Sequence, residues 1–268
     1  LLGVRVALRA VAADAHAERA RAAALSLRLP NSVQQAFANA VAKFAEKELA
    51  PGALERAHSP EYPWDIAKKI SAQGLLGIAF PEKDGGMGGT LMDAVIAIQE
   101  VALHCPKSAD VVQAGNFGAI RTFVEYASES QKEMYLPDLL AGKKILGLGM
   151  SEPGAGSAVT ELVTSAKKVD GGYVVNGSKV FSTHSPEAGL FLVYVRFGPG
   201  LEGIGSVLVE RGTPGLTVGK PNSFMSGEEW SQLYFEDCFI PDSALLLGPG
   251  GFKKQISGFN VERIGNAS

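Results

Sequence analysis

Residues 144–157 read Lys-Ile-Leu-Gly-Leu-Gly-Met-Ser-Glu-Pro-Gly-Ala-Gly-Ser and divide the chain into two parts of different pattern. The first half of this stretch is a short apolar run, typical of a buried strand. In the second half, Pro153 fixes one φ angle, while Gly154 and Gly156 let the chain turn. Uncovered N–H groups and the hydroxyls of Ser151 and Ser157 suit a phosphate or a flat polar ring. A glycine-rich hairpin turn without a ligand remains the alternative interpretation.

Two common phosphate-binding motifs do not match this stretch. A P-loop ends in Gly-Lys-Ser or Gly-Lys-Thr, and no lysine follows Gly156. A dinucleotide fingerprint needs a third glycine that opens a helix, but Ala158 and Val159 follow instead. If the loop binds a ligand, we therefore expect it to do so within β structure.

The composition excludes several classes of protein. With 25 basic and 28 acidic residues among 268, the net charge is −3, which favours neither a nucleic acid nor an anionic membrane as partner. The 2 cysteines lie far apart and the 4 histidines lack the spacing of metal ligands, so we expect neither a disulfide framework nor a metal site. No apolar run approaches the ~18 residues of a membrane span.

Residues 1–30 form an N-terminal extension rich in alanine and arginine. This composition resembles a weak transit peptide, although we favour an extended gene start or an exposed helix. The expected location is the cytoplasm, or the mitochondrial matrix if the extension is a transit peptide.

The remaining pattern predicts an α+β multidomain protein. Residues 31–141 carry helical spacing and are expected to form an all-α bundle. Residues 142–247 contain short strands separated by Gly and Pro signals, including an Asn-Gly turn at 176–177, and favour an antiparallel β-barrel or sandwich. Residues 248–268 begin a further helical domain, of which we expect this chain to hold only the first helix. The predicted helices before the strands cover residues 33–49, 64–73, 91–103, 111–124 and 131–140.

Five motifs along the chain together resemble one family. Phe-Pro followed by Gly-Gly-Met-Gly occupies residues 80–88, and Asn-Gly-Ser-Lys occupies residues 176–179. The other motifs lie at residues 131–142, 150–157 and 235–252. In this set the sequence resembles the acyl-CoA dehydrogenase family from about residue 32 to residue 268.

The resemblance implies an FAD-dependent oxidoreductase of fatty acid metabolism and β-oxidation. Such an enzyme oxidises an acyl-CoA thioester to the 2,3-enoyl-CoA, and an electron-transferring flavoprotein then takes the electrons. The implied assembly is a homo-oligomer, either a homotetramer or a dimer, or a complex with a complementary chain that carries the C-terminal domain.

The resemblance also assigns residues to the cofactor. Phe181 would pack on the flavin ring and Thr183 would bond its polar edge, although a core position and a strand-end hydroxyl are the alternatives. Ser157 would lie near the phosphate or the pantetheine of the substrate. The implied FAD-binding residues are Leu148, Met150, Ser151, Gly156, Ser157, Phe181, Ser182 and Thr183.

The catalytic base implied by the resemblance is Glu262. A group of family members that includes isovaleryl-CoA dehydrogenases places a glutamate before an arginine on the first helix after the β domain, where Glu262 and Arg263 stand here. Arg263 and Asn260 would contact the substrate. The alternatives are a solvated Glu262 and a base in a C-terminal domain beyond this chain.

Several residues depart from the family pattern. Ala158 replaces an Asp, Ser151 a Thr, Phe181 a Trp and His184 an Asn. These departures keep a second hypothesis open, in which the protein is a non-catalytic scaffold or partner subunit without flavin chemistry.

Overall fold

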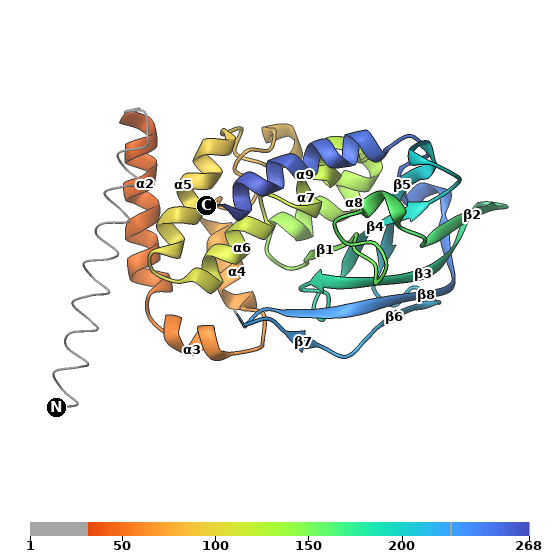
Figure 1. Cartoon of the computed structure of the whole chain (residues 1–268). Coiled ribbons are helices and arrows are strands. Elements are labelled where there is room, and N and C mark those ends of the chain that lie inside the picture. The colour runs from red at the N-terminus through yellow and green to blue at the C-terminus, as the bar shows by residue number, and fades with distance from the viewer. Residues whose placement is uncertain (1–31, 226, 268) are drawn as a thin grey trace.

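The computed structural model describes residues 32–225 and 227–267, in which helices and a nine-stranded sheet lie side by side (Figure 1). The predicted N-terminal extension lies outside these residues. The helices before the sheet are α2 (Ser32–Phe44), continued by the π-helical η1 (Ala45–Leu49), then α3 (Ala53–His58), α4 (Trp64–Ala72), α5 (Leu91–Ala102), α6 (Pro106–Ala114), α7 (Ala119–Tyr126) and α8 (Glu129–Leu140). One helix, α9 (Phe252–Asn266), follows the sheet.

Capping residues explain where two of the helices begin. The Thr90 hydroxyl accepts a hydrogen bond from the Asp93 amide at the start of α5, and the Asp93 carboxylate accepts one from the Thr90 amide. Ser128 and Gln131 form the same reciprocal pair at the start of α8. Each pair satisfies backbone N–H groups that have no partner within the helix.

The prediction of one helix over residues 111–124 is wrong, because the segment divides into α6 and α7. Gly118 adopts a φ of 68°, which interrupts the helix. At Gly115 a Cβ atom would lie 2.5 Å from the Leu76 side chain, so close packing requires a glycine there. This break places the start of α7 against the sheet unit, where it lines the cleft described below.

The sheet is mostly antiparallel and open, with β6 and β9 at the two ends of the strand order β6-β8-β3-β2-β4-β5-β9. β1 and β2 pair with β4 in parallel, and β7 pairs with β8. The prediction of a helical unit followed by a β unit is confirmed, but the sheet is open and contains parallel pairs, whereas the sequence favours a purely antiparallel barrel or sandwich. The strands are β1 (Leu146–Gly149), β2 (Ser165–Val169), β3 (Gly172–Thr183), β4 (Leu190–Arg196), β5 (Ile204–Glu210), β6 (Leu216–Val218), β7 (Asn222–Ser223), β8 (Glu229–Pro241) and β9 (Leu245–Leu247).

The predicted Asn-Gly turn at residues 176–177 is wrong, because both residues lie inside β3. Gly177 has a φ of 145°, and the register of β3 with β8 shifts between Val175 and Gly177. A Cβ atom on Gly177 would lie 2.5 Å from Thr164 Oγ1. The glycine therefore permits an irregularity in a long strand.

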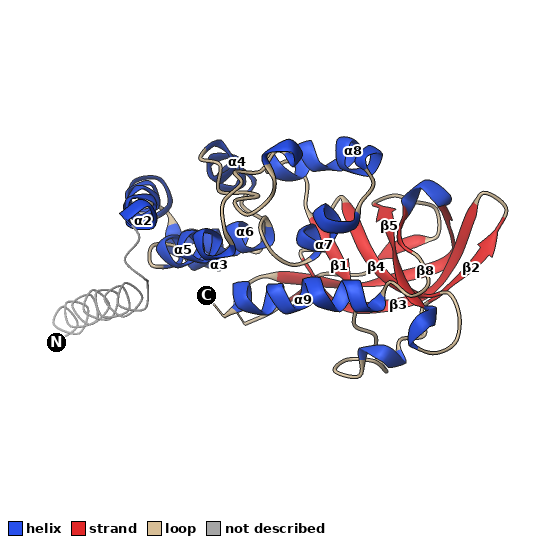
Figure 2. Ribbon diagram, turned by 90° about the horizontal axis from the view of Figure 1, so that it is seen from above, coloured by secondary structure: helices blue, strands red, loops and turns tan. Residues whose placement is uncertain are grey.

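Helices α7, α8 and α9 lie beside the sheet, as the view in Figure 2 shows. Phe123 and Leu136 share a buried core with Leu192 and Leu208 of the sheet. α9 approaches α7 closely, since a Cβ atom on Gly258 would lie 2.6 Å from Thr122 Oγ1. Within residues 32–225 and 227–267, no helix combines the length and the apolar character needed to cross a membrane.

Candidate functional site

A cleft of about 340 Å³ lies where the helical unit meets the sheet. β1 and the loop after it supply one wall, which contains Leu148, Met150 and Ser151. The end of β3 supplies a second wall, which includes Phe181 and Thr183. The third wall comes from α6 and the start of α7, so the cleft is bounded by both units of the chain.

The end of β3 is shaped by two residues in the left-handed region. Phe181 has a φ of 55° and His184 a φ of 56°, in a region that costs a non-glycine residue about 1–3 kcal/mol. The register between β3 and β8 also shifts between Lys179 and Ser182. As a result Phe181 turns outward and is 59% exposed, with its ring 4.8 Å from that of Trp230.

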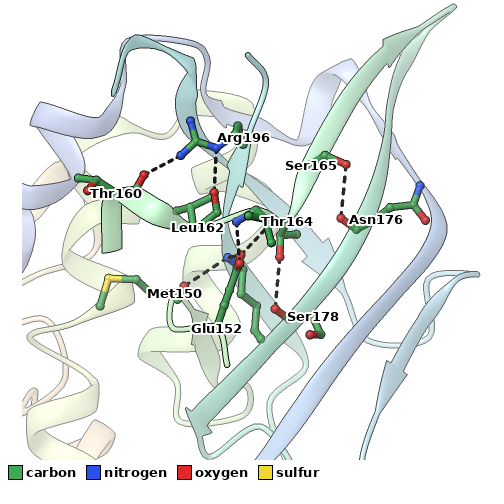
Figure 3. Close-up of polar contacts among 11 residues, drawn as sticks. Met150, Glu152, Thr160, Leu162, Thr164, Ser165, Asn176, Ser178 and Arg196 are labelled. Carbon is green, nitrogen blue, oxygen red and sulfur yellow. Dashed lines mark hydrogen bonds and ion pairs between the residues drawn. The ribbon is translucent and has the colours of Figure 1, made fainter. Parts of the chain in front are cut away.

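A buried ion pair anchors the loop that follows β1. Lys179 Nζ lies 2.7 Å from Glu152 Oε1 and 3.2 Å from the Met150 carbonyl oxygen. The Glu152 carboxylate also accepts hydrogen bonds from the amides of Val163 and Thr164, as Figure 3 shows for Thr164. One carboxylate therefore ties residues on both sides of the glycine-rich loop to β3.

Burial and the partner's charge together shift the pKa values of Glu152 and Lys179. Burial alone would raise the pKa of Glu152, but the charge and hydrogen bond of Lys179 and the bonds from Thr164 and Val163 outweigh it and lower the pKa. Burial lowers the pKa of Lys179 to about 8, against the opposing effect of Glu152. Both side chains are thus charged at neutral pH.

Arg196 holds the segment that returns from the loop to β2. Its Nε donates to the Leu162 carbonyl oxygen at 2.8 Å and its Nη2 to the Thr160 carbonyl oxygen at 2.6 Å (Figure 3). Its Nη1 donates to the Gly200 carbonyl oxygen at 2.9 Å. The segment after Ala158 is therefore fixed through its backbone, although Ala158 itself offers no polar side chain.

A second ion pair crosses from the sheet unit to the helical unit. His184 Nε2 lies 2.6 Å from Asp110 Oδ2 on α6, and both residues line the cleft. The Tyr62 ring meets the imidazole edge-on, with the ring centroids 5.4 Å apart. Burial alone would lower the pKa of His184, but the hydrogen bond and charge of Asp110, with smaller effects of Glu228 and Glu187, raise it.

Some of the predicted cofactor-binding residues line the cleft, and others do not. Five of the eight line the cleft, whereas Gly156 and Ser157 are exposed on the loop outside it. The Ser182 side chain is fully buried, and its hydroxyl has no hydrogen-bond partner. The five that line the cleft are Leu148, Met150, Ser151, Phe181 and Thr183. Their roles toward a cofactor stay predictions.

The predicted base and two of the predicted substrate residues lie on α9, and none of the α9 side chains that the structure describes lines this cleft. Asn260 and Arg263 are exposed, and Arg263 Nη1 donates to Asn260 Oδ1 at 2.5 Å. Glu262 lies on the same helix, but its side chain falls outside the part of the chain that the structure describes. The role of Glu262 as the base stays a prediction.

Sequence reasoning missed the wall formed by α6 and α7. Asp110, Gln113 and Phe117 line it, but no motif marks them and the apolar spacing predicts one continuous helix there. The two glycines at 115 and 118 are the available signal, because a helix break at these positions turns the start of α7 toward the sheet.

Comparison with known proteins gives matches over most of the chain. The sequence matches the family description "Acyl-CoA dehydrogenase, N-terminal domain" over residues 31–143 and "Acyl-CoA dehydrogenase, middle domain" over residues 147–238. An acyl-CoA dehydrogenase of Bacillus subtilis (strain 168) is 33% identical over 233 residues, which cover 85% of this chain and 62% of the relative.

Solved structures give the same picture. The butyryl-CoA dehydrogenase of Megasphaera elsdenii aligns with a TM-score of 0.81 and 31% identity, over 90% of this chain and 65% of that chain. A glutaryl-CoA dehydrogenase of Mycobacterium smegmatis in complex with FADH2 aligns with a TM-score of 0.80 and 25% identity, over 88% of this chain and 60% of that chain. The chain spans less than two thirds of the length of each of these proteins.

Proposed function

This chain belongs to the acyl-CoA dehydrogenase family, and we propose that it carries the flavin-binding part of an enzyme that oxidises an acyl-CoA thioester to the 2,3-enoyl-CoA. The cofactor is FAD, which is present in its reduced form in the M. smegmatis relative. The observation that carries the proposal is the cleft between the two units, whose walls combine apolar side chains with several polar and charged groups.

The residues that line the cleft fit one end of a flavin. Leu148, Met150 and Phe181 offer apolar surface to a flat ring, and Ser151 and Thr183 place polar groups beside it. When bound, FAD would accept the hydride that leaves the β-carbon of the substrate. The chain itself would bind and orient the ring and exclude water from one face of it.

The glycine-rich loop supports the same proposal. Cβ atoms built on Gly154 and Gly156 would meet no atom of the chain within 4 Å, and neither residue has a positive φ. Packing within the chain therefore requires no glycine at these two positions. Close approach of a ligand to the backbone does favour glycine, and we propose that the remainder of the dinucleotide passes over this loop.

The first test is the spectrum of the purified protein. We expect a yellow protein with stoichiometric FAD that bleaches when a short or branched acyl-CoA is added in the absence of an acceptor. A protein that retains no flavin and binds none when FAD is supplied would favour the alternative, a non-catalytic scaffold or partner subunit.

We propose Glu262 as the base that removes the α-proton, since a carboxylate immediately before Arg263 on α9 fits the family pattern. Glu262→Gln should leave FAD binding intact and reduce bleaching to less than about 1% of wild type, the loss expected when a general base is removed. The exposed Glu133→Gln is the matched control and should bleach normally. Bleaching of the Glu262→Gln variant at more than a few per cent of the wild-type rate would place the base elsewhere.

An electron-transferring flavoprotein is the proposed acceptor, and a homotetramer or dimer the proposed assembly. Reduction of that flavoprotein by the substrate-reduced protein tests the first proposal, and sedimentation equilibrium tests the second. An acceptor other than a flavoprotein, or a monomer at micromolar concentration, would contradict them.

A further inference from the structure

His184 and Asp110 join two segments that lie 74 residues apart and belong to different units of the chain. Their side chains are 13% and 25% exposed, so water screens the pair only in part. His184 directly follows Thr183 at the end of β3, and Asp110 lies on α6. Since both residues line the cleft, the contact spans two of its walls.

The backbone at His184 is held as firmly as the imidazole. Its amide donates to the Glu229 carbonyl oxygen at 2.8 Å, and its own carbonyl accepts from the amides of Glu187 and Ala188. The φ of 56° is one that a histidine adopts only when its surroundings enforce it. The turn therefore delivers the imidazole to Asp110 in a fixed orientation, and the same turn orients Thr183.

We propose that His184 and Asp110 are a positioning pair, which holds the end of β3 against α6 and thereby fixes the width of the cleft in which the flavin binds. The proposal rests on the proposed function for the identity of the ligand. In this assignment the pair acts on the flavin through Phe181 and Thr183, which line the same cleft.

The other charged and titratable groups around the imidazole belong to four elements. α6 contributes Lys107 beside Asp110, and the segment before α4 contributes Tyr62. The turn after His184 and the residues at the start of β8 contribute carboxylates, so the surroundings favour a protonated imidazole. The groups that line the small cavity around His184 are Tyr62, Lys107, Asp110, Glu187, Glu228 and Glu229.

A double-mutant cycle tests the pair. The dissociation constant of FAD is measured by flavin fluorescence for wild type, His184→Asn, Asp110→Asn and the double variant. Each single change should weaken FAD binding about tenfold, and the double variant should bind no more weakly than the single variants. Asp242→Asn breaks an exposed ion pair with Lys168 outside the cleft and should leave the constant unchanged.

Two further measurements distinguish a role of the pair in positioning the cleft from a role in the stability of the fold alone. FAD binding by wild type should weaken as pH rises through the pKa of His184, whereas binding by His184→Asn should not change over the same range. The imidazole signal that disappears in His184→Asn should titrate above 6.5 in wild type and at a lower pH in Asp110→Asn than in wild type. Single-variant effects on FAD binding that multiply in the double variant would overturn the proposal.

Failure of the proposed function gives a different result. If no form of the protein binds FAD, the proposed function fails, and the same cycle is then measured on the midpoint of urea unfolding. Coupling between the two changes in urea would uphold the contact across the cleft, and additive changes would overturn it.

Discussion

Two ion pairs near the cleft differ in what they connect. Lys179 and Glu152 lie within the sheet unit, with side chains 0% and 3% exposed, and fix the glycine-rich loop to its own strand. His184 and Asp110 are 13% and 25% exposed and fix one unit of the chain to the other. The burial of an ion pair determines how much stability is lost when the pair is broken. The segments that the pair joins determine which part of the site then moves.

The two pairs also respond to pH in opposite directions. The pKa of Glu152 is lowered in the folded protein, so its contribution to stability is present above 4.5 and is lost as pH falls through the folded value. The pKa of His184 is raised, so its contribution is fully present below 6.5 and is lost as pH rises through the folded value. Acid should therefore first weaken the ion pair that holds the glycine-rich loop. Alkali should first weaken the contact between His184 and Asp110.

The largest effect is expected from breaking the buried pair. Lys179→Met leaves Glu152 with its two backbone donors but without a counter-charge, and should lower the free energy of unfolding by about 3–5 kcal/mol. Urea unfolding at pH 7 measures this loss. Because the Glu152 contribution fades in acid, the difference between wild type and variant should shrink as pH falls below 4.5.

The double variant Glu152→Gln/Lys179→Met is the matched control for this prediction. It removes both charges, and the Gln side chain can still accept a hydrogen bond from Val163 or Thr164. We expect it to recover part of the stability that Lys179→Met loses. A Lys179→Met protein that loses less than about 1 kcal/mol would mean that the pair contributes no more than an exposed one.

A smaller effect is expected from the pair across the cleft. His184→Asn should lower the free energy of unfolding by about 1–2 kcal/mol at pH 6, because it removes a charge-assisted hydrogen bond that is partly open to water. The difference from wild type should decline as pH rises above 6.5 and through the raised pKa of His184, since wild type then loses the imidazolium charge. A difference that grows toward alkaline pH would contradict the assigned sign.

Much of the sheet unit follows from local sequence. The apolar run before the glycine-rich loop forms β1, and the Asp-Gly-Gly sequence at residues 170–172 joins β2 to β3 as a hairpin. Residues 216–218 form β6 directly after the turn sequence Thr213-Pro214-Gly215. These elements are predictable because turn residues and alternating apolar residues act over short distances.

The features that sequence did not predict depend on distant contacts. Asn176-Gly177 is typical of a turn, yet it lies inside β3 because Asn176 pairs with β2 and Gly177 pairs with β8. The left-handed φ of Phe181 has no signature in the sequence around it. His184 and Asp110 meet only after both units fold, so no local pattern pairs them.

The candidate site shows the same division. The resemblance predicted Leu148, Met150 and Thr183, all of which line the cleft. It could do so because the family's motifs lie at β1 and at the end of β3, and each of these segments forms one wall. It gave no residue of the α6 wall. Gly156 and Ser157 lie outside the cleft, and their predicted contacts with the dinucleotide depend on a ligand that extends beyond it.

The smallest effect is expected from an ion pair that connects no part of the site. Lys168 and Asp242 are each 54% exposed and join β2 to the turn after β8. Asp242→Asn removes the charge but leaves Lys168 over the Tyr173 ring, so the free energy of unfolding should fall by less than about 1 kcal/mol. Measured in urea at pH 6 and at pH 8.5, this loss should be the same. A loss as large as that of His184→Asn would show that proximity of opposite charges, and not the contact between the two units, accounts for the stability assigned to the pair across the cleft.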